Sequence, residues 1–215
     1  MIIVVDNNSK YKDDVFSKIT DKNVVFLEND IECKFELGAY ICGIKYITSN
    51  NLLQNYDYYI MTQDNFVVKN KYDFNKLKDL NITACPINSG VYDVSDHKLA
   101  EICNQVLTNI NLNDHLTEIT FCWCASFIIH FSKIEQLYSY IKDIIITTRV
   151  ESMASERYLA RLLYELNEHK NFDIDGDIRL LKNFYDCWKI NFYNNNIKTY
   201  FVKKVQQKTE KSLDL

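Results

Sequence analysis

The sequence predicts an α/β fold, in which helices flank a mostly parallel central sheet within a single domain. The first 61 residues alternate between continuous apolar runs, typical of buried strands, and segments with apolar residues at helical spacing. This alternation is typical of parallel sheets, because each helix carries the chain back to the start of the next strand. With 215 residues, 47% of them hydrophobic, the chain is long enough to bury one large core. We expect one domain over 1–205 and a polar tail over 206–215.

Three strands and two helices are predicted in the first third of the chain. Apolar runs at 2–5, 24–27 and 58–61 predict the strands. Apolar residues recur at helical spacing over 11–19 and 35–46, which predicts the helices. The second helix is apolar on two sides, so we expect it to lie between two layers.

The second half of the chain is less regular. The elements predicted there are a short strand over 81–86, a helix over 97–110, a central strand over 121–130, and helices over 132–141 and 152–168. Ser132 is placed to cap the fourth of these elements. The fifth is the clearest, because it carries four leucines on one face: Leu159, Leu162, Leu163 and Leu166.

Polar side chains follow each of the first three predicted strands. The three clusters are Asp6-Asn7-Asn8, Glu28-Asn29-Asp30 and Gln63-Asp64-Asn65. Ligands of parallel α/β sheets bind beyond the carboxyl ends of the strands, where these ends meet. We therefore expect the three clusters to converge on one edge of the sheet and to form a binding site.

Composition excludes several classes of protein. The seven cysteines are odd in number, scattered and mostly within apolar segments, which indicates reduced core thiols and a cytoplasmic protein, in the host cytoplasm if the chain is viral. The four histidines share no metal-binding spacing, so no structural zinc is expected. A net charge of −4 argues against duplex nucleic acid as a partner. No apolar stretch approaches the roughly 20 residues of a membrane span.

The sequence contains neither of the glycine-rich phosphate-binding motifs. GxGxxG does not follow the first strand, and GxxxxGK[ST] does not occur. A nucleotide bound at the predicted edge would therefore be held by side chains and a metal. Asp64, at the tip of a buried strand, is a suitable ligand for Mg²⁺ or Mn²⁺. The alternative is an ordinary turn acid, since Asp and Asn favour turns on their own.

Three stretches together resemble the start of glycosyltransferases of the GT-A fold, which is related to the Rossmann fold. They are IIVVDNNS, VVFLENDIECKFELGAY and YDYYIMTQDNFVV, and the resemblance covers about residues 1–70. It is strongest to small viral and bacterial enzymes that build capsule, capsid or cell-surface glycans. In this family the third stretch carries a DxD motif, whose last acid holds the metal on the diphosphate of the donor. Here the motif is relaxed to one acid, Asp64, with Asn65 or water completing the metal shell.

The resemblance implies transfer of a sugar from a nucleotide sugar, most simply a UDP-sugar, to a hydroxyl of a glycan or glycoprotein, assisted by Mn²⁺ or Mg²⁺. It implies that polar residues after the first two strands hold the base and ribose: Asp6, Asn8, Glu28 and Asn29. Lys34 and Lys203 are then placed at the diphosphate, and Gln63 and Asn65 lie beside the metal. Lys203 belongs to KTYFVKKVQQK, which resembles a closing aromatic-x-Lys element, although a solvated basic tail is the alternative.

VESMASERYLARLLYELN resembles the late helix on which inverting members of the family carry their general base. Glu156 fits that position best, with Glu151 in reserve. A carboxylate near the anomeric carbon suits sugar transfer, which passes through an oxocarbenium-like state. The alternative is that these acids only complement the helix dipole.

Two other functions remain open at the level of sequence. A nucleotidyltransferase also uses acids at strand ends, but it needs more carboxylates and a glycine-rich loop, and the chain has only four glycines. A non-catalytic nucleotide-sugar-binding or assembly module with the same fold would explain the incomplete DxD.

Overall fold

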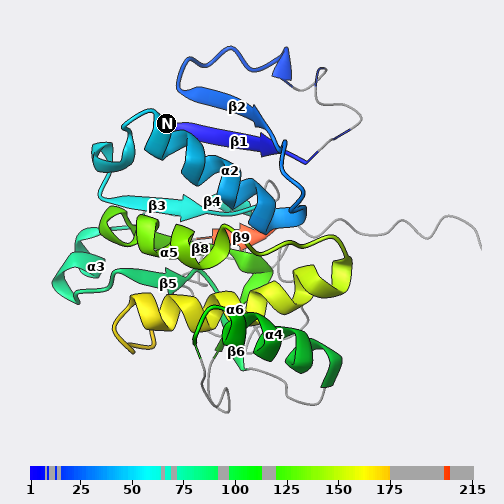
Figure 1. Cartoon of the computed structure of the whole chain (residues 1–215). Coiled ribbons are helices and arrows are strands. Elements are labelled where there is room, and N and C mark those ends of the chain that lie inside the picture. Colours follow the sequence, from blue (N-terminus) through cyan, green and yellow to red (C-terminus); the bar gives the residue numbers. More distant parts are fainter. Residues whose placement is uncertain are drawn as a thin grey trace, which may run out of the picture.

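The computed structural model describes residues 1–7, 9, 13, 16–63, 66–68, 72–91, 97–112, 120–174 and 201–203. The strands are β1 Ile2–Asp6, β2 Val24–Glu28, β3 Tyr58–Met61, β4 Phe66–Val68, β5 Ala84–Pro86, β6 Ser89–Val91, β7 Thr120–Cys122, β8 Phe127–His130 and β9 Phe201–Lys203. The α-helices are α2 Phe35–Ser49, α3 Asn75–Asp79, α4 His97–Asn109, α5 Ile134–Ile141 and α6 Arg149–Leu166. Short 3₁₀ turns are η1 Leu53–Asn55, η2 Trp123–Ala125 and η3 Phe131–Lys133. Together they form a mixed α/β structure (Figure 1).

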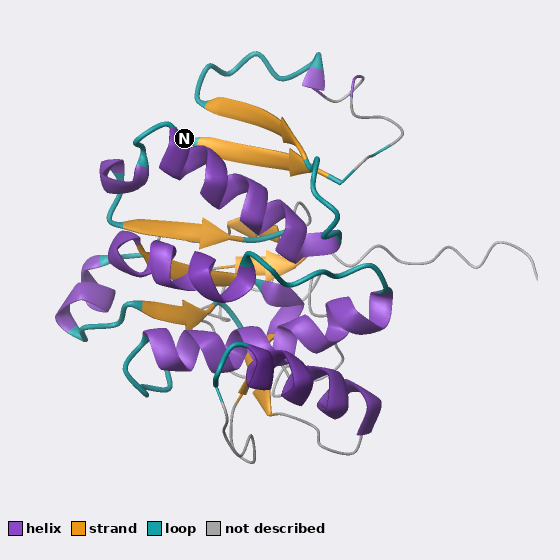
Figure 2. Ribbon diagram, viewed as in Figure 1, coloured by secondary structure: helices purple, strands orange, loops and turns teal. Residues whose placement is uncertain are grey.

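The N-terminal elements form where the sequence predicts them. β1, β2 and β3 coincide with the three apolar runs, and α2 extends the predicted helix to Ser49. β1 and β2 pair in parallel, with Ile2 opposite Val24 and Asp6 opposite Glu28. Helix α2 crosses in front of the strands between β1 and β3 in Figure 2 and packs against β1, α5 and α6. It therefore lies between layers, as its two apolar sides predict. Of the helix predicted over 11–19, residues 11, 12, 14 and 15 lie outside the described residues.

The prediction of a mostly parallel central sheet is wrong for the described strands. β8 lies between β3 and β5 and pairs antiparallel with both, with Tyr58 opposite His130 and Ala84 opposite Ile129. Among the described strands, β1 and β2 are the parallel pair. Apolar runs cannot reveal this, because a strand buried on both faces has the same pattern in either direction.

The strand predicted over 121–130 is two strands. β7 pairs with β6, and β8 joins the sheet of β3 and β5. Between them the chain turns at Cys124 and Ala125, both with φ of 52°. Non-glycine residues rarely adopt positive φ, so propensity alone argues against this turn. Within it, Ser126 Oγ donates a hydrogen bond to the Cys124 carbonyl at 3.1 Å.

Helix starts also differ from the predictions. Ser132 does not cap α5; instead His130 Nδ1 accepts a hydrogen bond from the Ser132 amide at 3.3 Å, at the start of η3. Helix α6 begins at Arg149, three residues before the predicted start, and Thr148 is its cap.

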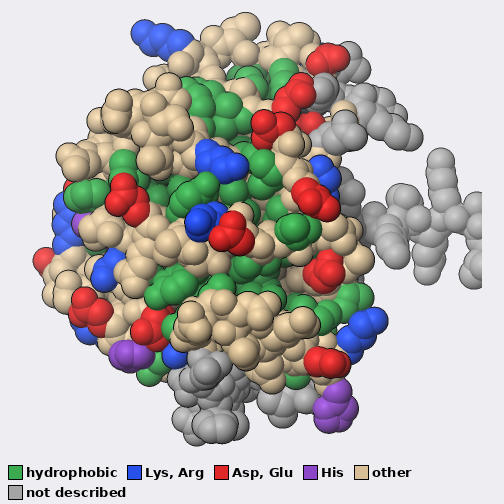
Figure 3. Space-filling model, viewed as in Figure 1, with side chains coloured by type: hydrophobic (Ala, Val, Ile, Leu, Met, Phe, Trp, Pro, Cys, Tyr) green, Lys and Arg blue, Asp and Glu red, His purple; other side chains and the backbone are tan. Residues whose placement is uncertain are grey.

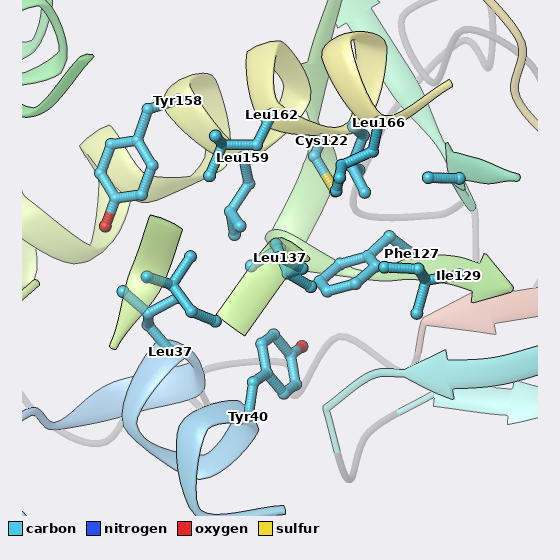
Figure 4. Close-up of a cluster of buried hydrophobic side chains, with 14 of the residues drawn as sticks. Leu37, Tyr40, Cys122, Phe127, Ile129, Leu137, Tyr158, Leu159, Leu162 and Leu166 are labelled. Atoms are coloured by element: carbon cyan, nitrogen blue, oxygen red, sulfur yellow. The ribbon is translucent and has the colours of Figure 1, made fainter. Parts of the chain in front are cut away.

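The largest core cluster joins α2, α6 and β8 (Figure 4). Leu159, Leu162 and Leu166 of α6 point toward Phe127 of β8, while Leu37 of α2 approaches from the other side. All four leucines on the predicted face of α6 are buried, which confirms that pattern.

The cysteines also lie in the interior. The six that the structure describes are buried and form no disulfide bond with one another, which confirms the prediction of core thiols for these six: Cys33, Cys42, Cys85, Cys103, Cys122 and Cys124. Burial raises the pKa of the Cys103 thiol to about 12. Such thiols are protonated at neutral pH and chemically inert. None of the helices in the described residues is long and apolar enough to cross a membrane.

Candidate functional site

The carboxyl ends of β1 and β2 meet at one edge, as predicted. Asp6 and Glu28 are opposite in the register, and the amide of Asn29 donates to the Asp6 carbonyl at 2.8 Å. The side chains that follow are also joined, since Asn29 Nδ2 donates to Asn7 Oδ1 at 2.6 Å. Asp6 is half-buried and accepts from the Ser9 amide at 2.8 Å, whereas Glu28 is exposed. Two of the three predicted polar clusters thus form one polar edge.

The beginning of α2 is held against this edge by long-range contacts. Asn29 Nδ2 also donates to the Cys33 carbonyl at 2.8 Å, and Asn7 Nδ2 donates to the Phe35 carbonyl at 3.1 Å. Gly38 permits this approach, because a Cβ at that position would lie 2.0 Å from the Cys33 carbonyl oxygen and 2.6 Å from Asn29 Nδ2. A side chain at residue 38 would therefore push the helix away from both strand ends.

The end of β3 is joined to the same helix through Glu36. Gln63 Nε2 donates to Glu36 Oε1, and Ser152 Oγ donates to Glu36 Oε2 at 3.2 Å. Ser152 in turn accepts from Arg149 Nη1 at 3.2 Å. Ser152 is only 3% exposed, whereas Glu36 and Gln63 are half-buried and Arg149 is exposed, so this network lies at a partly buried seam between α2 and α6. Figure 1 shows the carboxyl ends of β1, β2 and β3 on the side where α2 and α6 begin.

Glu36 is the functional candidate that the sequence reasoning did not single out. It belongs to the ELGAY stretch, but an acid in the first turn of a helix is common for purely local reasons. Its partners lie 27 and 116 residues away in the chain. Only the tertiary structure identifies them.

Lys34 lies at the same edge. Its side chain is exposed, and Nζ donates to the Ile31 carbonyl at 3.0 Å. Its amide donates to the Ile146 carbonyl at 2.8 Å, which fixes the loop before α6 beside the start of α2.

Glu151 has a structural task. It forms a capping box with Thr148: its amide donates to Thr148 Oγ1 at 3.3 Å, and its Oε2 accepts from the amides of Thr147 and Thr148, each at 2.8 Å. These backbone hydrogen bonds lower the pKa of the Glu151 carboxyl. A carboxylate with a lowered pKa, one oxygen of which already accepts two backbone hydrogen bonds, is a weak proton acceptor.

Glu156 lies deeper along α6. It is half-buried, and after burial its charge is the largest influence raising the pKa of the Cys122 thiol on β7. It follows Ser152 by four residues, so the two share a face of α6 about 6 Å apart along the axis. Because Ser152 contacts Glu36, Glu156 stands one turn from the Glu36 network.

Three predicted site residues, Asn8, Asp64 and Asn65, lie outside the described residues. Lys203 ends β9, which pairs antiparallel with β4 so that Lys203 is opposite Phe66. Phe66 follows Asp64 by two residues in the sequence, so the partner of the predicted diphosphate lysine is the third residue of the stretch that begins with the predicted metal ligand.

Groups that could bind metal or polyanions are dispersed over the residues that the structure describes. Within the described part of the chain, His, Cys, Asp and Glu do not form a cluster of three or more. Acidic and basic side chains are interspersed over the face drawn in Figure 3, where the described residues form no continuous basic patch. Comparisons of the chain with protein-family models, with curated proteins and with solved structures found no match.

Proposed function

We propose that this protein is a metal-assisted, nucleotide-sugar-dependent glycosyltransferase with a GT-A-like fold. It transfers a sugar, from a UDP-sugar in the simplest case, to a hydroxyl of a glycan or glycoprotein. The observation that carries the proposal is the β4–β9 pairing, which brings Lys203 to the segment that follows Asp64. These two segments are distant in sequence, and the resemblance gives both of them a role at the donor diphosphate.

The polar edge supplies the nucleotide end of the proposed site. The exposed Glu28 carboxylate and the half-buried Asp6 beside it are acceptors for ribose hydroxyls or base N–H groups. Asn29 was expected to hold the base or ribose, but its side-chain amide already donates to Asn7 Oδ1 and to the Cys33 carbonyl. Its task is to position the two strand ends and α2, while Asn8 remains a candidate for direct contact.

The donor atoms predicted around the metal fit a hard cation. Asp64 offers a carboxylate and Asn65 an amide oxygen, the ligand types that Mg²⁺ and Mn²⁺ prefer. Bound there with the donor, the metal would neutralise charge on the departing diphosphate. Lys34 and Lys203 carry positive charges that complement the diphosphate in the same way. Glu36 accepts a hydrogen bond from Gln63, the residue directly before Asp64, and holds it in place.

Glu156 is the proposed base. The acceptor oxygen attacks the anomeric carbon, its proton passes to the Glu156 carboxylate, and the electron pair of the broken C–O bond leaves with the nucleoside diphosphate. Attack opposite the leaving group inverts the anomeric centre. Glu156 is preferred over Glu151 because the Glu151 carboxylate is bonded to two backbone amides of the cap.

The test is release of nucleoside diphosphate from a panel of nucleotide sugars, with Mn²⁺ and a mixture of glycan acceptors. Glu156→Gln is expected to lower the transfer rate by roughly 10²–10⁴-fold while nucleotide binding persists. Glu151→Gln should lose stability but keep the rate; the opposite ranking would move the base to Glu151. If the wild-type protein released diphosphate from none of the donors yet bound them, the non-catalytic module would replace the transferase.

A further inference from the structure

A second candidate binding site lies at the opposite end of β3. β3 runs from Tyr58 to Met61, so the groove at its amino end and Gln63 beyond its carboxyl end are about 16 Å apart along the strand. The groove has a volume of about 820 Å³, within the range of small-molecule sites. Its lining comes from η1, β3, α3 and the segment leading into α3, which lie together at the left of Figure 1.

Aromatic rings form an apolar floor in this groove. Tyr58 and Phe74 are stacked, with ring centroids 5.8 Å apart and an interplanar angle of 29°, and Tyr72 meets Phe74 edge-on at 5.3 Å. The Tyr58 hydroxyl donates to the Ile82 carbonyl at 3.1 Å, which fixes its ring. The floor is therefore preorganised rather than assembled on binding.

The same groove exposes apolar surface to solvent. Tyr56 is 41% exposed and Ile60 is 40% exposed, although both are large hydrophobic residues. Both line the groove. Exposed apolar groups gathered in a concave site, rather than scattered singly, indicate a ligand surface.

The polar lining combines amides with a few charged groups. It consists of three exposed amides, Gln54, Asn55 and Asn75, and three charged groups, Asp57, Asp73 and Lys78. Lys78 Nζ is already paired with Asp57 at 2.8 Å. Two acids and one lysine give this lining a net charge of −1, which disfavours phosphate and nucleotide ligands. Amides both donate and accept hydrogen bonds, so they match hydroxyl groups in either direction.

We propose that this groove binds a neutral oligosaccharide. Ring faces pack against the C–H faces of sugar rings, and the flanking amides bind their hydroxyls. Among the described strands β3 pairs along one edge only, with β8, so an extended peptide is the competing occupant that the test below includes. This inference does not rest on the proposed transfer reaction. If both hold, the groove retains a glycan on the protein at a distance from the donor edge.

Titration of the full chain with neutral oligosaccharides of glucose, mannose, xylose and N-acetylglucosamine, followed by calorimetry, tests the inference. At least one series is expected to bind saturably. Tyr56→Ala should weaken that binding roughly tenfold, and Tyr56→Phe should retain it because the ring remains. Ile145→Ala, which truncates an exposed apolar side chain outside the groove, is the control and should leave binding unchanged. Unchanged urea unfolding of Tyr56→Ala verifies that the variant is folded.

Three results would overturn the inference: absence of binding by every series at millimolar concentration, binding that Tyr56→Ala leaves unchanged, or binding of an unstructured mixed-sequence peptide with no oligosaccharide binding. Nucleotide binding serves to separate the two proposals. Tyr56→Ala should leave it intact, so failure at this groove and failure at the donor edge give different patterns.

Discussion

Helices α2 and α6 begin on the same side of the molecule but are held there in different ways. The start of α6 is fixed by its own sequence, through the capping box of Thr148 and Glu151. The start of α2 has no side-chain cap; its N-cap residue is Lys34, and the structure fixes it through Asn7, Asn29 and Glu36 instead. The start of α2 lacks a local cap and is held by residues of three other segments, two of which follow β1 and β2. Its position is therefore tied to the geometry of the strand-end edge. Changes there should disturb both the fold and the strand-end edge, whereas changes at the α6 cap should affect stability alone.

Gly38→Ala should have the largest effect. Its Cβ would lie 2.0 Å from the Cys33 carbonyl oxygen, so α2 must shift away from β1 and β2. We expect a loss of about 3 kcal/mol in the free energy of unfolding, from urea denaturation. Gly43→Ala is the matched control on the same helix, because the nearest atom to its Cβ is Val5 Cγ2 at 4.0 Å. There the better helix propensity of alanine should stabilise the protein by about 0.5–1 kcal/mol. Equal losses in the two variants would refute the packing argument.

Ser152→Ala should have the next largest effect, because it removes a hydrogen bond to the Glu36 carboxylate in a buried position. We expect a loss of about 1.5–3 kcal/mol in unfolding free energy, together with weaker nucleotide binding, since Glu36 also holds Gln63. Ser155→Ala is the control: this serine is equally buried, but its hydroxyl donates to the Ser152 carbonyl within the helix at 2.7 Å. A nucleotide affinity unchanged in Ser152→Ala would separate the network from the donor edge.

Thr148→Ala should cost about 1 kcal/mol, the usual loss on removal of a helix N-cap. Thr148→Ser keeps the capping hydroxyl and should recover most of the stability. Both variants should bind nucleotide like the wild type, because the cap is local to α6. A nucleotide affinity that falls with the cap would contradict the distinction between the two helix starts.

The pH dependence of stability should show the smallest effect. Backbone hydrogen bonds lower the pKa of Glu151 in the folded state below its ordinary value of 4.5. Its contribution to stability is therefore complete above that value and is lost as the pH falls through the lower folded pKa. Urea unfolding of the wild type and Glu151→Gln between pH 6 and pH 3 should show a steeper fall for the wild type. Parallel curves would show that the carboxylate does not support the cap.

Some elements of the fold, including α2 and α6, are predictable from the sequence, and others are not. Apolar periodicity identifies β1, β2, β3, α2 and α6, because it reports burial, and burial is what those elements share. The turn at Cys124 and the antiparallel direction of β8 are not predictable in this way, since both depend on which segments pair.

The residues of the candidate site also fall into two groups: those that the sequence identifies and those that only the tertiary structure identifies. The polar residues Asp6, Glu28 and Asn29 could be recognised as strand ends, and they meet as expected. The Glu36–Ser152 contact could not be predicted, because an acid in a first helical turn has a sufficient local explanation. The β4–β9 pair also joins short segments from distant parts of the chain. Pairings of this kind leave no periodic signal in the sequence.

Calorimetric titration of UDP, with and without Mn²⁺, into the wild type and Asp64→Ala tests the central claim most directly. Asp143→Ala removes an exposed acid whose partner is Lys142, at 3.6 Å, and serves as the control. The transferase account predicts UDP binding that Mn²⁺ strengthens in the wild type and in Asp143→Ala, but not in Asp64→Ala. UDP binding that is independent of both Mn²⁺ and Asp64, or no binding of any nucleotide, would contradict a metal-assisted donor site at the carboxyl ends of these strands.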